Sequence, residues 1–244
     1  MTFTARPRGR PPPPPGNRIG WPAVKPFFQR DTAAGVIVGV TLAAAVLVEW
    51  GVTLRERTAG EGRPARRMAV AARTLREVTL FRTGERREED RNTKWALVGS
   101  VASGLVLGGA AQRAFPGLAF PDTGWAPTAI GVAVMWAGIG LRAWAIATLG
   151  RFFRRDIQVA EDQVVVRSGP YAAIRHPAYA GNLLMLAGFG IVLANWASLA
   201  ALVVIPVLGH MPRIVVEDAL LTDRLGEPYR VYARTTARLV PGVW

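Results

Sequence analysis

The residues with the clearest chemical character lie together between Ser168 and Gly181. This fourteen-residue run contains an Arg-His-Pro sequence, two tyrosines and a second proline, and a long apolar segment follows it directly. Pro177 restricts His176 to extended backbone conformations, while glycine lets the backbone approach a ligand closely. A cation, an imidazole and two phenols on a rigid turn predict a binding site at the boundary between water and lipid.

Other polar segments of the chain are expected to meet this turn. Arg213 and Glu217 are four positions apart and therefore share one face of a helix. An exposed pair of this kind would contribute only about 0.5 kcal/mol or less to stability. The pair is a candidate for the site because it is expected to lie beside the histidine turn. We expect convergence of three segments, residues 149–158, 163–181 and 213–232.

The composition indicates an integral membrane protein. Half of the 244 residues are hydrophobic, and several uncharged runs approach the roughly 20 residues needed to cross a bilayer. The net charge of +13 also suits nucleic acid, but the basic residues gather in the N-terminal tail and in loops between apolar runs. Contact with anionic lipid headgroups is therefore favoured over nucleic acid. The absence of cysteine excludes thiol chemistry, and two histidines disfavour a structural zinc site.

The apolar runs predict an all-α protein with about five transmembrane spans. Three runs are expected to form single helices over residues 32–54, 95–111 and 126–148. The 29-residue stretch 182–210 is expected to form a helical hairpin that turns at Asn195. Gly104 and Gly108 suit close packing of one helix on another.

Two charged residues lie within these apolar runs. Glu49 is near the end of the first run, where a carboxylate can reach the membrane surface. Arg142 lies deeper in the third run, where it either extends to the nearer interface or faces a polar cavity.

The distribution of Lys and Arg predicts the orientation. Residues 55–94 contain twelve of them, residues 150–180 and 211–244 contain five each, and residues 112–124 contain one. Basic loops remain on the cytoplasmic side, so the histidine turn and the C-terminus should share that side. Within the charged segment 55–94, residues 68–79 are expected to form an amphipathic helix on the membrane surface or a solvated helical linker.

Five features resemble the isoprenylcysteine carboxyl methyltransferase family and its phospholipid methyltransferase relatives. They are LGRFF, VVVRSGPYAAIRHPAYAG, the apolar hairpin, RIVVEDALLTDRLGEPYRVY and the final RLVPG. The resemblance covers about residues 135–244. It implies an integral membrane methyltransferase that uses S-adenosyl-L-methionine and releases S-adenosyl-L-homocysteine. A strand followed by the GxGxxG motif of soluble nucleotide-binding folds does not occur.

The resemblance divides the chain and assigns roles to its residues. It implies a methyltransferase core (131–244), whereas the composition alone predicts a disordered tail rich in proline and arginine (1–30) and N-terminal transmembrane helices with a basic loop (31–130). Arg213 would hold the acceptor carboxylate. The implied cofactor contacts are Gln158, Gln163, Val164, Val165, Val166, Tyr171, His176, Pro177, Ala178, Tyr179 and Glu217. His176 acts either as a catalytic base or in positioning the cofactor, and the second reading suits its rigid backbone better. Asp218 stands where the family commonly has glutamate.

The favoured activity is carboxyl O-methylation of a lipophilic, isoprenylcysteine-like or prenylated substrate, because Arg213 suits an anion. N-methylation of a phospholipid amine is the alternative within the same class. A membrane scaffold without activity, in contact with lipids and partners through its basic loop, is the alternative of a different class. We expect residence in the cell membrane with the site facing the cytoplasm, and neither nucleic acid nor a metal as a partner.

Overall fold

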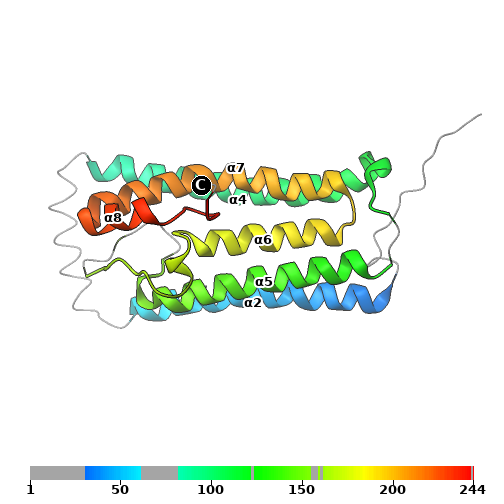
Figure 1. Cartoon of the computed structure of the whole chain (residues 1–244), viewed down its shortest axis with the longest axis horizontal. Coiled ribbons are helices and arrows are strands. Elements are labelled where there is room, and N and C mark those ends of the chain that lie inside the picture. Colours follow the sequence, from blue (N-terminus) through cyan, green and yellow to red (C-terminus); the bar gives the residue numbers. More distant parts are fainter. Residues whose placement is uncertain (1–30, 62–81, 122–123, 155–158, 160–161, 243) are drawn as a thin grey trace, which may run out of the picture.

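The computed structural model describes residues 31–61, 82–121, 124–154, 159, 162–242 and 244, with the backbone alone over 52–61 and 82–91. Within this part of the chain, antiparallel helices form an elongated bundle (Figure 1). The helices are α2 (Thr32–Glu61), α4 (Arg82–Ala114), α5 (Ala126–Leu149), α6 (Pro177–Val192), α7 (Trp196–Leu225) and α8 (Glu227–Thr235). The expected all-α membrane fold is confirmed, whereas the amphipathic segment expected near residues 68–79 lies outside the described residues.

The helices differ in their ability to cross a membrane. Among the residues that the structure describes, four segments are long and apolar enough to do so, namely Thr32–Gly51, Asn92–Ala114, Ala126–Phe152 and Trp196–Leu225. Helix α6 has 16 residues, which corresponds to about 24 Å at the usual rise per residue. Because a hydrocarbon core is about 30 Å thick, α6 leaves a recess at one end of the bundle. Figure 1 shows that α6 begins short of the ends of α5 and α7, at the end of the bundle where α8 lies.

The predicted hairpin is formed by α6 and α7. The Asn195 side chain caps α7 by accepting hydrogen bonds from the backbone N–H groups of Ala197 and Ser198, at 2.9 and 3.1 Å. Its amide also donates to the Phe115 carbonyl at 3.0 Å, which ties the turn to the end of α4. Beyond the hairpin, α7 continues through two internal prolines as far as Leu225. One helix therefore carries the membrane segment and the polar residues that follow it.

Glycines allow α5 and α6 to pack backbone against backbone. A Cβ atom added at Gly131 would lie 2.6 Å from the Gly188 carbonyl oxygen, and one added at Gly138 would lie 2.6 Å from the Gly181 carbonyl oxygen. Close approach through small residues is a common way to join helices in lipid, where burial of apolar surface gives little driving force.

The same kind of contact joins α4 to α7. A Cβ atom added at Gly104 would lie 3.2 Å from the Pro206 ring, and one added at Gly108 would lie 2.9 Å from the Leu202 side chain. The close helix packing expected of the two glycines is thus confirmed.

The α5–α6 contact predicts a steric effect of one methyl group. Replacing Gly131 with alanine should lower the free energy of unfolding by about 1–3 kcal/mol, because two of the three contacting atoms belong to the backbone of α6 and the helices must separate. Gly140→Ala is the matched control, since no atom lies within 4 Å of its added Cβ. Thermal denaturation in detergent measures both. Equal melting temperatures for the two variants would contradict the close packing.

Candidate active site at the recessed end of the bundle

A cavity of about 310 Å³ lies at the recessed end, within the range of small-molecule sites. It is bordered by residues of α2, α4, α5, α6 and α7 and by the segment between α5 and α6. The predicted site residues that line it are Gln163, Val164, Val165, Val166, Tyr171, His176, Ala178, Tyr179, Arg213 and Glu217. Pro177 is buried but is not part of the lining, and Gln158 lies outside the described residues.

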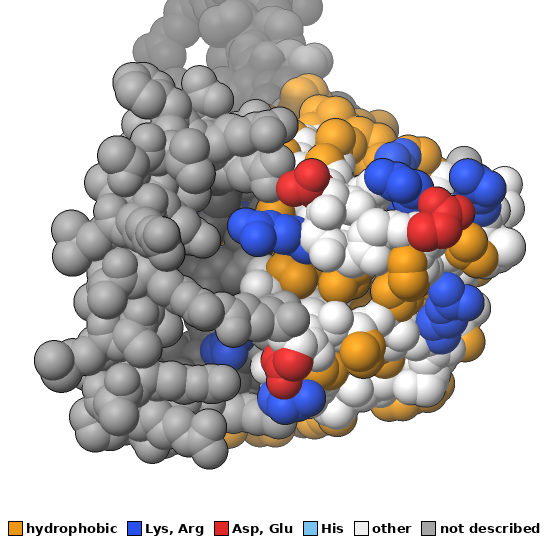
Figure 2. Space-filling model, turned by 90° about the vertical axis from the view of Figure 1, so that its left-hand side faces the viewer, with side chains coloured by type: hydrophobic (Ala, Val, Ile, Leu, Met, Phe, Trp, Pro, Cys, Tyr) orange, Lys and Arg blue, Asp and Glu red, His pale blue; other side chains and the backbone are white. Residues whose placement is uncertain are grey.

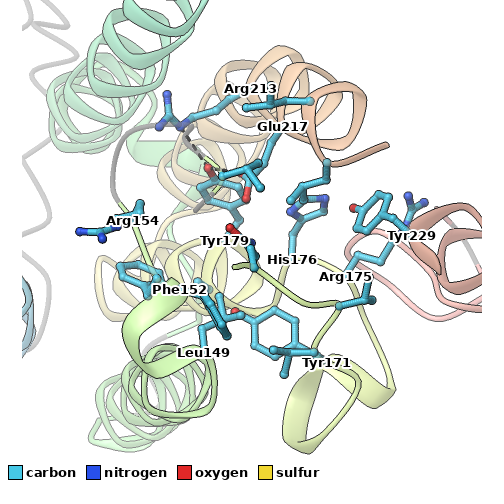
Figure 3. A pocket seen from close by; sticks show the side chains of 18 of the residues that line it. Leu149, Phe152, Arg154, Tyr171, Arg175, His176, Tyr179, Arg213, Glu217 and Tyr229 are labelled. Carbon is cyan, nitrogen blue, oxygen red and sulfur yellow. Dashed lines mark hydrogen bonds between the residues drawn. The ribbon is translucent and has the colours of Figure 1, made fainter. Parts of the chain in front are cut away.

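Tyr179 connects the two charged residues of α7. Its hydroxyl accepts a hydrogen bond from Arg213 Nε at 3.0 Å and donates one to Glu217 Oε2 at 2.8 Å. Figure 3 shows the three side chains side by side at the edge of the cavity. Arg213 is 4% exposed, so these residues are not a surface ion pair. A cation and an anion are thus held at defined positions in one cavity.

Asp218 is the acceptor that holds the histidine turn. His176 Nε2 lies 2.9 Å from Asp218 Oδ1, and because a carboxylate only accepts, His176 carries its proton on Nε2. Arg175 Nη1 donates to Asp218 Oδ2 at 2.8 Å, and Arg238 Nε donates to the same oxygen at 2.9 Å. The Tyr229 hydroxyl donates to Asp218 Oδ1 at 2.5 Å. One carboxylate therefore joins the turn, α7, α8 and the C-terminal segment.

The C-terminal segment also holds the turn through its backbone. The N–H groups of Arg175 and His176 donate to the carbonyls of Ala237 and Arg238 at 2.8 and 3.0 Å. The turn and the C-terminus therefore share one end of the molecule, as the sequence predicts.

Three buried tyrosines surround the turn as protonated donors. Burial raises the pKa of Tyr232 to about 12, and its hydroxyl donates to the Tyr171 carbonyl at 2.7 Å. Burial raises the pKa of Tyr171 well above its usual value, with a smaller effect of Glu217. Burial, together with the neighbouring Asp218 carboxylate, does the same to the pKa of Tyr229. None of the three phenols therefore ionises near neutral pH.

The opposite wall of the cavity is largely apolar. Helix α5 ends at Gly150, whose φ of 56° lies in the left-handed region that glycine adopts without strain. The chain turns there, and Leu149 and Phe152 face the cavity across from the histidine turn (Figure 3).

At the end of the bundle, Lys and Arg side chains lie among acidic and apolar ones in the described part of the surface (Figure 2).

Several residues of the site were not assigned to it from the sequence. Asp218 was noted only as a departure from a family pattern, although its position beside Glu217 was an available signal. Of the two alternatives for Arg142, the cavity is correct: Arg142 lines it and forms an ion pair with Glu49 of α2. Lys94 of α4 also lines the cavity, and no local pattern indicated this.

The membrane-length helices and the charged cavity at one end of the bundle define a class, a polytopic helical membrane protein with a polar cavity at one end. Residues 130–223 match the model of the isoprenylcysteine carboxyl methyltransferase (ICMT) family. The resemblance inferred from the motifs is thereby confirmed for this region.

The similar proteins include two named for the family's methyltransferase activity and one named for metal resistance. Protein-S-isoprenylcysteine O-methyltransferase A of Arabidopsis thaliana is 33% identical over 131 residues, 53% of this chain and 65% of the relative. The Tribolium castaneum protein-S-isoprenylcysteine O-methyltransferase is 32% identical over 129 residues, 52% of this chain and 45% of the relative. Cobalt-zinc-cadmium resistance protein CzcN of Cupriavidus metallidurans is 33% identical over 104 residues, 42% of this chain and 48% of the relative.

One solved structure, of the eukaryotic intramembrane Ras methyltransferase ICMT, has a similar fold. It aligns with a TM-score of 0.51 and 28% identity over 60% of this chain and 52% of the other. The chain spans less than two thirds of the length of each of these relatives. The family match over residues 130–223 falls on α5 to α7 and on the segment between α5 and α6.

Proposed function

We propose that this protein is an integral membrane methyltransferase that uses S-adenosylmethionine to methylate the carboxylate of a lipophilic, isoprenylcysteine-like acceptor. The observation that carries the proposal is the Arg213–Tyr179–Glu217 chain of hydrogen bonds. It lies inside a cavity formed largely by the region that matches the methyltransferase family. Residues 131–244 would be the catalytic core.

The cavity residues suit the chemistry of this cofactor. Its amino and hydroxyl groups need acceptors, and Glu217 offers a carboxylate beside the Tyr179 hydroxyl. Its flat aromatic base needs an apolar surface, which Phe152 and the 164–166 segment offer. His176 and Ala178 border the same space. When bound, the cofactor supplies a methyl group that a positive sulfur already activates.

The acceptor requires positioning more than activation. A carboxylate with a reference pKa near 4 is ionised at neutral pH, so no general base is needed. Arg213 would hold this carboxylate through charge-assisted hydrogen bonds, and orientation of two reactants is worth on the order of 7–11 kcal/mol. His176 Nε2 donates a hydrogen bond to Asp218, which fixes the orientation of the ring at the border of the cavity.

The location of the site agrees with a lipid-derived acceptor. Helix α6 is too short to fill the membrane, and the cavity at its N-terminus adjoins membrane-spanning helices. A lipophilic acceptor would reach it from the bilayer. The excess of Lys and Arg in the segments at this end supports a cytoplasmic orientation in the cell membrane.

Ligand binding tests the cofactor part of the proposal. Purified protein in detergent should bind S-adenosylhomocysteine in calorimetry, and His176→Ala or Glu217→Ala should weaken binding about tenfold or more. The reason is that each change removes a hydrogen-bonding group worth about 1.5 kcal/mol or more when charge is involved. Glu227→Ala is the control, because Glu227 is exposed and lies outside the cavity. Absence of heat and of a thermal shift at millimolar ligand would instead favour a membrane scaffold.

The same preparation tests the acceptor. Transfer of a labelled methyl group should occur to prenylcysteine analogues or other lipophilic carboxylates and not to phosphatidylethanolamine. Labelling of phosphatidylethanolamine alone would replace carboxyl methylation with amine methylation.

A further inference from the structure

An ion pair joins the first membrane helix to the cavity. Arg142 Nε of α5 contacts Glu49 Oε1 of α2, and both residues line the cavity. The Arg142 side chain is 12% exposed and that of Glu49 is 38% exposed. Ionisable groups at membrane depth are expensive to keep and generally serve a function. Glu49 also lies outside the region that matches the family, so the family likeness does not account for it.

Arg142 contacts the turn that carries the site. Its Nη1 donates a hydrogen bond to the Ala178 carbonyl at 3.2 Å, and Ala178 stands between the His176-Pro177 pair and Tyr179. A Cβ atom added at Gly181 would lie 2.9 Å from the backbone nitrogen of Arg142. The Arg142 guanidinium therefore connects α2 to the first turn of α6. At Gly181 the backbones of α5 and α6 are so close that the two helices have little freedom to shift.

The surroundings strengthen the pair. A second cavity of about 190 Å³ lies between α2, α5 and α6, and it shares Glu49, Arg142 and Asn182 with the main cavity. The rest of its lining is apolar, formed by Ala45, Val46, Val48, Ile139, Met185 and two glycines. Electrostatic attraction and hydrogen bonds are stronger in such a low-dielectric setting than in water. The pair thus stands where the polar cavity meets apolar space.

We propose that Glu49 and Arg142 are positioning residues of the site: Glu49 orients Arg142, and Arg142 fixes the first turn of α6 through the Ala178 carbonyl. Helix α2 is then a functional part of the site rather than an additional membrane anchor. Release of Arg142 loosens the turn and displaces the His176 ring and the Tyr179 hydroxyl from their partners on α7. The consequence for ligand binding rests on the proposed function, whereas the consequence for the turn does not.

Two measurements on the full chain test this proposal. Hydrogen exchange in detergent should be about tenfold faster in a peptide covering residues 176–182 for Glu49→Ala, and similarly for Arg142→Ala. The double variant should exchange no faster than either single one, because the two residues act as a unit. Affinity for S-adenosylhomocysteine should fall about tenfold in the same variants. Arg142→Lys should not restore it, because one ammonium group cannot replace two separate guanidinium contacts.

Glu49→Gln is the milder second variant, which keeps the size of the side chain, and Glu227→Gln is the matched control in an exposed ion pair. Unchanged exchange over residues 176–182 in the Glu49 variants would overturn the proposal. Equal acceleration across α5 and α7 would also overturn it, since that indicates a general loss of stability. Faster exchange with unchanged affinity would show that the turn is held but does not serve the site. Absence of ligand binding by the unmodified protein would remove the proposed function, while the exchange result would still decide the role of the ion pair.

Discussion

Replacing Arg213 with alanine should leave the affinity for S-adenosylhomocysteine within about twofold and reduce methyl transfer at least about a hundredfold. Arg213 is buried and donates to the Tyr179 hydroxyl. In the variant, Tyr179 still donates to Glu217, so the groups proposed to hold the cofactor keep their contact. What is lost is the cation that would orient the acceptor carboxylate.

Paired measurements separate these two effects. Calorimetry gives the dissociation constant of the cofactor product, and transfer of a labelled methyl group to a prenylcysteine analogue gives the turnover. Arg213→Lys should retain the charge but transfer more slowly than the unmodified protein, because lysine lacks the planar pair of donors. Equal losses of affinity and turnover would place Arg213 in the cofactor pocket instead.

Replacing Asp218 with alanine should have the largest effect on stability, a loss of about 3–5 kcal/mol. Asp218 accepts from Arg175, His176, Tyr229 and Arg238, and its side chain is 9% exposed. Without the carboxylate, two guanidinium groups lose their common partner in a partly buried setting. The turn, α8 and the C-terminal segment should therefore separate.

Denaturation followed by circular dichroism in detergent measures this loss. Asp218→Glu should be milder, since it keeps the charge and changes only the reach of the side chain. Asp162→Asn is the control, because Asp162 forms an exposed ion pair with Arg151 and such pairs contribute little. Similar melting temperatures for the Asp218→Ala and Asp162→Asn variants would show that the shared carboxylate does not hold these segments together.

The sequence by itself determined the membrane class, the hairpin and many of the polar residues that line the cavity. Long apolar runs are visible without a structure because the thickness of the bilayer sets their length. Asn195 marked the turn because an N-cap depends on neighbours only two and three residues away. The histidine turn and the Arg213–Glu217 face were also recognisable, because their spacing follows from local backbone geometry.

Only the tertiary structure decided how these parts meet. The Arg142–Glu49 contact joins residues 93 positions apart, and the His176–Asp218 contact joins residues 42 apart. Both depend on the rotation and depth at which helices distant in the sequence pack against one another. A hydrophobic run specifies that a helix forms and roughly how long it is. It does not specify which charged side chain of another helix will lie within hydrogen-bonding distance.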